Sequence, residues 1–338
     1  MKTIVSVQEV DELEIKPQSE VSEWRQLVAS EIRDRWSDRS GWLSVSCPCC
    51  AEEAKETAFE RVGIPYVECP SCQTLYAPQR PDEDSLSAWY RDSLPARFWR
   101  DRLLVASRDM RRDKIVLPRA RWVMDSIAEY VPSATRLLDV STNGRPLVDA
   151  VLEESPALEA WVAGPTADIE DSSQERVLAQ PTPVAGLTGW GPMHVVTAVD
   201  ALDRAANLPA LVRAARDALV PDGVLLATVP VASGFEIQSL WDRSPSILPP
   251  DKLNLPTIEG LQRLFDDRSW ALLELSTPGM FDVEIIRRTM SSTPEAEWPR
   301  ALRALVEHTD VGEQRRLIEY LQSRRLTSFA RVVARRIH

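Results

Sequence analysis

The chain has 338 residues, 44% of them apolar and 27% charged, a composition that is typical of soluble globular proteins and excludes a fibrous or wholly disordered chain. Its length allows two or three domains. The 40 lysines and arginines and 51 acidic residues give a net charge of −11, so the surface as a whole repels nucleic-acid phosphates.

The N-terminus lacks the apolar core of a signal peptide, and no apolar run reaches the roughly 18–20 residues that span a bilayer. We therefore expect a cytoplasmic protein without membrane or nucleic-acid partners. In that compartment the five cysteines are expected to be metal ligands or free thiols.

The charge is unevenly distributed along the chain. Residues 311–338 contain seven arginines and only two glutamates. This stretch is either a solvated, arginine-rich amphipathic helix or a surface for an anionic partner.

In chain order, the pattern predicts a helical segment over 1–43, a small β-ribbon over 44–80, a helical linker over 81–130 and an α/β domain over 131–338. Alternating strands and helices in the last region predict a mostly parallel sheet with helices on both faces. Its predicted strands are 135–140, 160–163, 194–199, 224–229, 271–276, 283–287 and 329–334, and its predicted helices are 147–154, 208–219, 258–267 and 297–325.

Two cysteine pairs are the strongest motif. Cys47 and Cys50 form one Cys-x2-Cys pair, and Cys69 and Cys72 form a second after 18 intervening residues. Two such thiolate pairs on tight turns close a tetrahedral zinc site without an open position, which indicates a structural metal. Cys49 falls outside the paired spacing. The alternative interpretation is a set of five ordinary buried thiols.

Eight segments resemble one known family. They are Cys69–Ala77, Trp89–Ser93, Phe98–Trp99, Leu137–Val140, Leu219–Pro230, Ser233–Trp241, Pro249–Asp251 and Thr277–Glu284. The chain resembles bacterial class I S-adenosylmethionine (SAM)-dependent methyltransferases that carry an N-terminal zinc ribbon. The resemblance implies a Rossmann-like sheet of seven strands, SAM as cofactor, and methyl transfer to a small, in some members sugar-linked, acceptor.

The resemblance also assigns site residues. On the cofactor side it implies binding by Asp139, Ser141, Asn143, Gly144 and Asp200. On the acceptor side it points to two carboxylates as catalytic residues, Glu236 and Asp282. The alternatives are a solvated loop carboxylate for Glu236 and a turn cap for Asp282.

The cofactor side departs from the family pattern. Ser141, Asn143 and Arg145 stand at the three glycine positions of the SAM loop, and Gly164 stands where a ribose-binding acid is expected. Asp168 and Asp171 follow and could replace that acid. Loss of the ribose contact costs about 1.5–3 kcal/mol, which predicts weakened SAM binding.

Two further departures remove histidines. Asp203-Arg204 replaces a Glu-His pair of the family, and Lys252 replaces the histidine of a Pro-Pro-Asp-His segment.

Two hypotheses follow. The first is an active methyltransferase that acts on a small-molecule acceptor. The second is a methyltransferase-fold protein that has lost catalysis and acts as a binding or scaffolding subunit for a protein partner. A nicotinamide-dependent enzyme fits poorly because the loop after Val140 lacks the Gly-x-Gly-x-x-Gly pattern.

Overall fold

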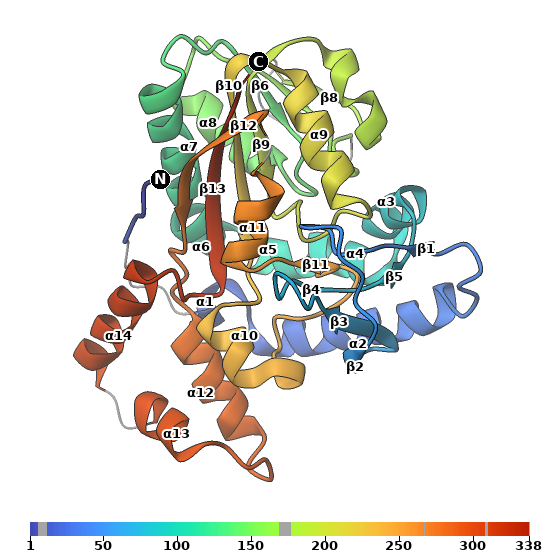
Figure 1. The fold of residues 1–338 in the computed structure, drawn as a ribbon, viewed down its shortest axis with the longest axis vertical. Coiled ribbons are helices and arrows are strands. Elements are labelled where there is room, and N and C mark those ends of the chain that lie inside the picture. Colours follow the sequence, from blue (N-terminus) through green and yellow to red (C-terminus); the bar gives the residue numbers. More distant parts are fainter. Residues whose placement is uncertain (6–11, 169–176, 267, 308–309, 338) are drawn as a thin grey trace.

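A seven-stranded sheet forms the centre of the molecule (Figure 1). The computed structural model describes residues 1–5, 12–168, 177–266, 268–307 and 310–337. The strand order is β12-β13-β10-β9-β6-β7-β8. The strands are β6 (Arg136–Asp139), β7 (Glu159–Val162), β8 (Val177–Ala179), β9 (Met193–Val199), β10 (Leu219–Pro230), β12 (Trp270–Ser276) and β13 (Phe329–Arg336).

Strand directions confirm the predicted fold class. β6 to β10 pair in parallel, whereas β13 runs antiparallel between β10 and β12. One strand prediction in this domain, for residues 283–287, is wrong. This segment belongs to a helix, α12 (Asp282–Ser292), because its buried residues Val283, Ile286 and Met290 follow helical spacing. β8 had not been predicted.

Helices cover both faces of the sheet. The principal ones are α7 (Leu117–Tyr130), α8 (Arg145–Glu154), α9 (Leu208–Ala218) and α11 (Ile258–Leu264). Successive strand residues alternate between the two cores, as the pleat requires. Leu137 packs with α7 and α8, and its neighbour Leu138 packs with α9 and α11. Side-chain caps begin two of these helices, at Asn207 for α9 and Thr257 for α11.

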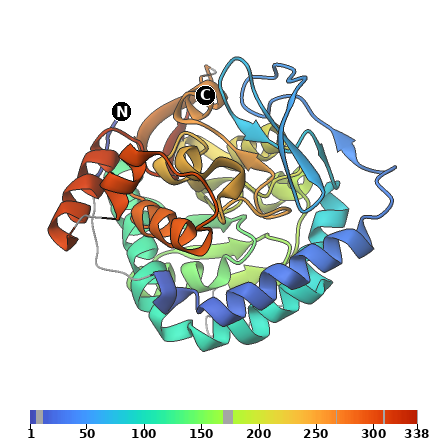
Figure 2. The same cartoon turned by 90° about the horizontal axis from the view of Figure 1, so that it is seen from below.

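The N-terminal and linker helices lie at the end of the molecule towards which the parallel strands point, and α2 runs beside the linker when seen from below (Figure 2). Aromatic pairs hold them together: Trp24 contacts Trp99 at 4.9 Å between ring centroids, and Trp36 stacks on Trp89 at 4.8 Å. The elements are α1 (Glu12–Ile15), α2 (Gln18–Arg35), α3 (Glu83–Asp92), α4 (Leu94–Phe98), α5 (Leu104–Ala106) and α6 (Arg108–Arg111), with π-helical turns at Trp99–Leu103 and Arg112–Val116.

The remaining helices lie near the same end of the sheet. They are α10 (Phe235–Leu240), α13 (Arg300–Val306) and α14 (Val311–Ser323), and a 3-10 turn at Trp241–Arg243 follows α10. A second 3-10 turn, Val184–Trp190, lies against α9 and leads to the start of β9. A capping box between Asp310 and Glu313 begins α14. Within the described part of the chain, every helix is too short or too polar to cross a bilayer.

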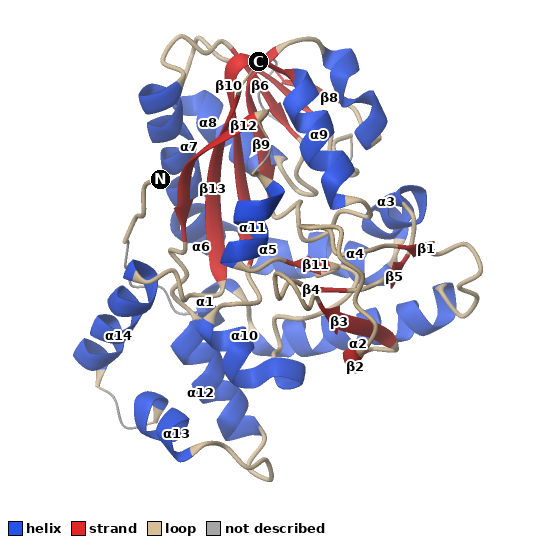
Figure 3. Ribbon diagram, in the orientation of Figure 1, coloured by secondary structure: helices blue, strands red, loops and turns tan. Residues whose placement is uncertain are grey.

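The cysteine-bearing ribbon is a second, smaller group of strands, separate from the large sheet in Figure 3. Its hairpin joins β2 (Thr57–Arg61) and β3 (Ile64–Glu68), and β4 (Leu75–Tyr76) follows; β1 (Leu43–Ser44) pairs with β5 (Gln79–Arg80). The ribbon is built into the larger domain, because β4 also pairs with β11 (Asn254–Leu255).

Arg80 anchors this junction. Its guanidinium is fully buried and donates to the carbonyls of Ala77, Ala205 and Leu253 and to the side-chain oxygen of Asn254. Burial lowers the pKa of Arg80 to about 10, so it remains charged at neutral pH. One side chain thus fastens the ribbon to two loops of the α/β domain.

We expect Arg80→Met to lower the free energy of unfolding by about 3 kcal/mol or more, because each buried acceptor left without a donor costs about 1–3 kcal/mol. Urea denaturation measures this, with the exposed Arg97→Met as the matched control. A loss below about 1 kcal/mol would show that water replaces the guanidinium.

Candidate functional site

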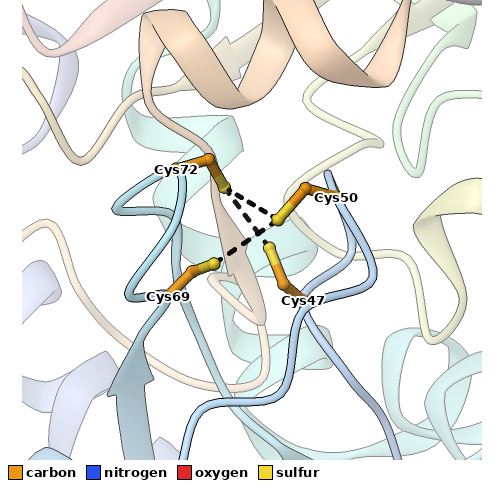
Figure 4. Close-up of side chains that lie close together, drawn as sticks. All are labelled: Cys47, Cys50, Cys69 and Cys72. Atoms are coloured by element: carbon orange, nitrogen blue, oxygen red, sulfur yellow. Dashed lines mark hydrogen bonds between the residues drawn. The ribbon is translucent and has the colours of Figure 1, made fainter.

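The four predicted ligand cysteines come together. The sulfur atoms of Cys47, Cys50, Cys69 and Cys72 all lie within 4.8 Å of one another, and three of their separations are 3.5 Å (Figure 4). A tetrahedron of sulfurs with metal–sulfur bonds of about 2.3 Å has edges of about 3.8 Å. The cluster is therefore close to the size that encloses one metal ion.

Two similar turns position these cysteines. In the first, the amide of Ala51 donates to the carbonyl of Cys47; in the second, the amide of Gln73 donates to the carbonyl of Cys69. Ala51 and Gln73 each have a positive φ, of 63° and 57°, so each turn folds back immediately after its second cysteine. Cys49 is also buried but lies outside the cluster.

A cavity of about 460 Å³ lies where β6, β9 and β10 end, and we call it the edge cavity. Its walls come from α1, α2, α6, α7, the loop after β6, the loops flanking α10, and the starts of α12 and β13. This volume is within the range of small-molecule sites. Six of the predicted site residues line it: Ser141, Asn143, Gly144, Asp200, Glu236 and Asp282.

The seventh, Asp139, is buried behind the loop and fixes its shape. Its carboxylate accepts from the hydroxyls of Ser141 and Thr197 and from the amide of Ser141. Burial raises the pKa of Asp139 to about 6. A Cβ on Gly144 would lie 1.6 Å from Asp139 Oδ1, so only glycine fits there. The Ser141 hydroxyl also accepts from the amide of Val199, which ties the loop to β9.

The space beyond β7 is closed by the protein itself. Gly164 lies against the loop so closely that a Cβ there would be 1.9 Å from the carbonyl oxygen of Ser141. The hydroxyl of Thr166 donates to the carbonyl of Thr142. Arg91 covers the same region, because it pairs with Asp168 at 2.6 Å and donates to the carbonyl of Pro165. The loop after β6 is therefore held against the residues that follow β7.

Asp168 is thus engaged by Arg91, and Asp171 lies outside the described residues. Asp200 has a partner as well. It follows β9 with a φ of 52°, and Arg119 pairs with its carboxylate at 2.9 Å. Burial opposes ionisation of Asp200, but the charges of Arg119, Lys252 and Arg204 lower its pKa below the ordinary value.

The two carboxylates on the acceptor side differ in their surroundings. Asp282 Oδ1 accepts from the amide and hydroxyl of Ser328 and from the amide of Glu236, so it joins α12, β13 and α10. The Glu236 carboxylate accepts from the hydroxyl of Ser244 at 2.5 Å and also interacts with Ser246. Burial raises the pKa of Glu236 to about 7 and also raises that of Asp282. Asp282 therefore links three segments of the chain, whereas Glu236 lies beside serine side chains.

The residues that replace the family's histidines form two crossed ion pairs. Arg204 pairs with Asp251 at 3.3 Å, and Lys252 pairs with Asp203. Sequence analysis had singled out Arg204 and Lys252 as departures without identifying this pairing. The sequence did contain a signal for this pairing, because each of the dipeptides 203–204 and 251–252 consists of an acid followed by a base.

The raised pKa of Glu236 predicts a pH-dependent gain in stability for Glu236→Gln. The folded-state pKa of about 7 exceeds the ordinary 4.5, so the native protein loses stability as pH rises between these values. Above pH 7 the full cost of about 3 kcal/mol is present, and the neutral amide removes it. Below pH 4.5 the gain vanishes.

Urea denaturation of wild type and Glu236→Gln at pH 5 and pH 8 measures this difference, with Glu60→Gln on exposed β2 as control. An equal effect at both pH values would mean that Glu236 is ionised in the folded protein throughout.

A family model described as "Methyltransferase domain" matches residues 96–275, more than half of the chain. No curated protein matches. Among solved structures, coclaurine N-methyltransferase bound to N-methylheliamine and SAH is 12% identical (TM-score 0.40; 64% of this chain, 70% of that chain). A putative sarcosine dimethylglycine methyltransferase from Galdieria sulphuraria is 10% identical (TM-score 0.42; 65% of this chain, 85% of that chain). The plantazolicin methyltransferase in complex with SAH is 11% identical (TM-score 0.43; 75% of this chain, 94% of that chain).

Proposed function

The chain belongs to the methyltransferase-domain family, and on that premise we propose that it catalyses SAM-dependent methyl transfer to a small acceptor bound in the edge cavity. The observation that carries the proposal is the convergence on this cavity of the loop after β6, Asp200 and the two buried carboxylates Glu236 and Asp282. Ligands of open α/β sheets bind at the carboxyl ends of the strands, where this cavity lies.

The protein's own groups suit the acceptor side. SAM, when bound, supplies an electrophilic methyl group. Glu236, with a pKa of about 7, is poised to accept a proton from a hydroxyl or amine of the acceptor near neutral pH. Asp282 holds the start of α10, and with it Glu236, in place through the amide of Glu236.

The loop after β6 packs tightly against the residues that follow β7. We infer that a nucleoside at the end of β7 requires Ser141–Gly144 to separate from Gly164–Thr166.

This closure favours a second candidate function, a binding subunit without methyl transfer. Gly164 against Ser141, Arg91 on Asp168, and Arg119 on Asp200 together occupy the groups that a cofactor would use. In that case the edge cavity binds a ligand, and the fold presents it to a partner.

Titration calorimetry with SAM and with S-adenosylhomocysteine (SAH) separates the two functions. We expect SAH to bind in the micromolar range, and Thr166→Ala to bind it several-fold more tightly, because a state that is open for a larger fraction of time has a higher apparent affinity. Thr293→Ala, which removes a similar hydroxyl-to-carbonyl bond outside the cavity, is the control. Absence of binding at millimolar SAM and SAH would remove the methyltransferase proposal.

For the cysteine cluster we propose a structural zinc ion. Its support is the four-sulfur geometry, because four protein ligands complete a tetrahedral zinc site and leave no position open for catalysis. A ribbon of this size has too little core to fold without such a cross-link.

Metal analysis of the purified protein should give about one zinc per chain. Cys50→Ser should lose the metal and unfold the ribbon, whereas the neighbouring Cys49→Ser should retain it, because Cys49 lies outside the cluster. Equal zinc content in the two variants would contradict the assignment.

A further inference from the structure

Three arginines from different elements line one side of the edge cavity: Arg111 at the end of α6, Arg119 on α7 and Arg331 on β13. The charge of Arg119 acts on both of the others. Arg119 is the member with a carboxylate partner, Asp200. For Arg111 and Arg331, no ion pair is formed within the described part of the chain.

The contacts that hold Arg111 and Arg331 leave much of their donor capacity unused. Arg111 donates to the carbonyl of Ile15 at 3.2 Å and lies over the ring of Trp99 at 5.6 Å. Arg331 lies over the ring of Trp122 at 5.1 Å, and its Nε is buried without a hydrogen-bond partner. A guanidinium has five N–H donors, so both side chains can bind a further acceptor.

Burial makes this arrangement electrostatically unfavourable without a counter-ion. It is the main cause that lowers the pKa of Arg111 and of Arg331 to about 10, and Arg119 adds repulsion at both. Both remain protonated at neutral pH. Asp200 attracts Arg111 and Glu274 attracts Arg331, but neither carboxylate forms an ion pair with that arginine in the described part of the chain.

The carboxylates of the cavity do not neutralise these arginines. Glu12 is paired with Lys16 and Arg288, and Asp251 with Arg204. Glu236 and Asp282 have raised pKa values because they are buried. The arginine side of the cavity therefore carries an excess of positive charge.

We infer that the ligand of the edge cavity is anionic, with a phosphate or carboxylate group that Arg111 and Arg331 bind. Charge-assisted hydrogen bonds from a guanidinium to such groups are about twice as strong as hydrogen bonds between neutral groups. This inference rests on the proposed function in one respect, namely that the acceptor binds in the edge cavity. The anionic group is then part of the acceptor.

Calorimetric titration of the full chain with inorganic phosphate and, separately, with malonate tests this at constant ionic strength. We expect binding to wild type, and affinity about tenfold or more weaker in Arg111→Gln and Arg331→Gln, since bonds to charged groups contribute most. Arg121→Gln, on the exposed side of α7, should bind as wild type does. If circular dichroism shows that Arg331→Gln does not fold, Arg111→Gln alone tests the inference.

Failure of both anions to bind wild type, or equal affinity in Arg111→Gln and Arg121→Gln, would overturn the inference. SAH and 5′-methylthioadenosine, which lacks the amino-acid carboxylate, distinguish the source of the anion. If Arg111→Gln weakens SAH but not 5′-methylthioadenosine, the arginines bind the cofactor and the acceptor assignment is wrong. Phosphate binding without SAH binding would leave the inference standing and remove the proposed methyl transfer.

Discussion

The edge cavity depends on the junction between the cysteine ribbon and the α/β domain. β4 of the ribbon pairs with β11, and the segment just before β11 carries Asp251 and Lys252 into the cavity wall. Thr257, the N-cap residue of α11, donates a hydrogen bond from its hydroxyl to the carbonyl of Cys72 at 2.6 Å. The cysteine ribbon is therefore joined on both sides of β11 to the segment that carries Asp251 and Lys252. A metal in the ribbon would act on the cavity through this strand pairing rather than through chemistry.

Most of the central fold could be predicted from local sequence patterns. Its strands are short apolar runs, and the segments between them have apolar residues at helical spacing. Val283–Arg287 was assigned wrongly for a physical reason. β-branched Val283, Ile285 and Ile286 favour a strand locally, whereas tertiary burial of Val283, Ile286 and Met290 requires a helix. β8 was missed because three residues carry too little periodicity to be recognised.

The candidate site divides in the same way. Cysteine spacing identified the four clustered residues, since the turns that present them are local. The partners of the acidic residues could not be predicted, because Arg119 and Asp200 are 81 residues apart and meet only in the folded chain. Nor could the sequence indicate that Gly164, which lacks the expected carboxylate, would pack against the loop after β6.

The placement of β13 has a consequence for how the polypeptide reaches this structure. It separates β10 from β12 at the centre of one half of the sheet, yet roughly a hundred residues intervene between β10 and β13. Until β13 inserts, both neighbouring strands expose unpaired edges that can capture another chain. On the ribosome, the position of β13 in the sheet therefore stays unfilled while α10 to α14 are synthesised. Chaperone demand during production is therefore expected to concentrate in this interval.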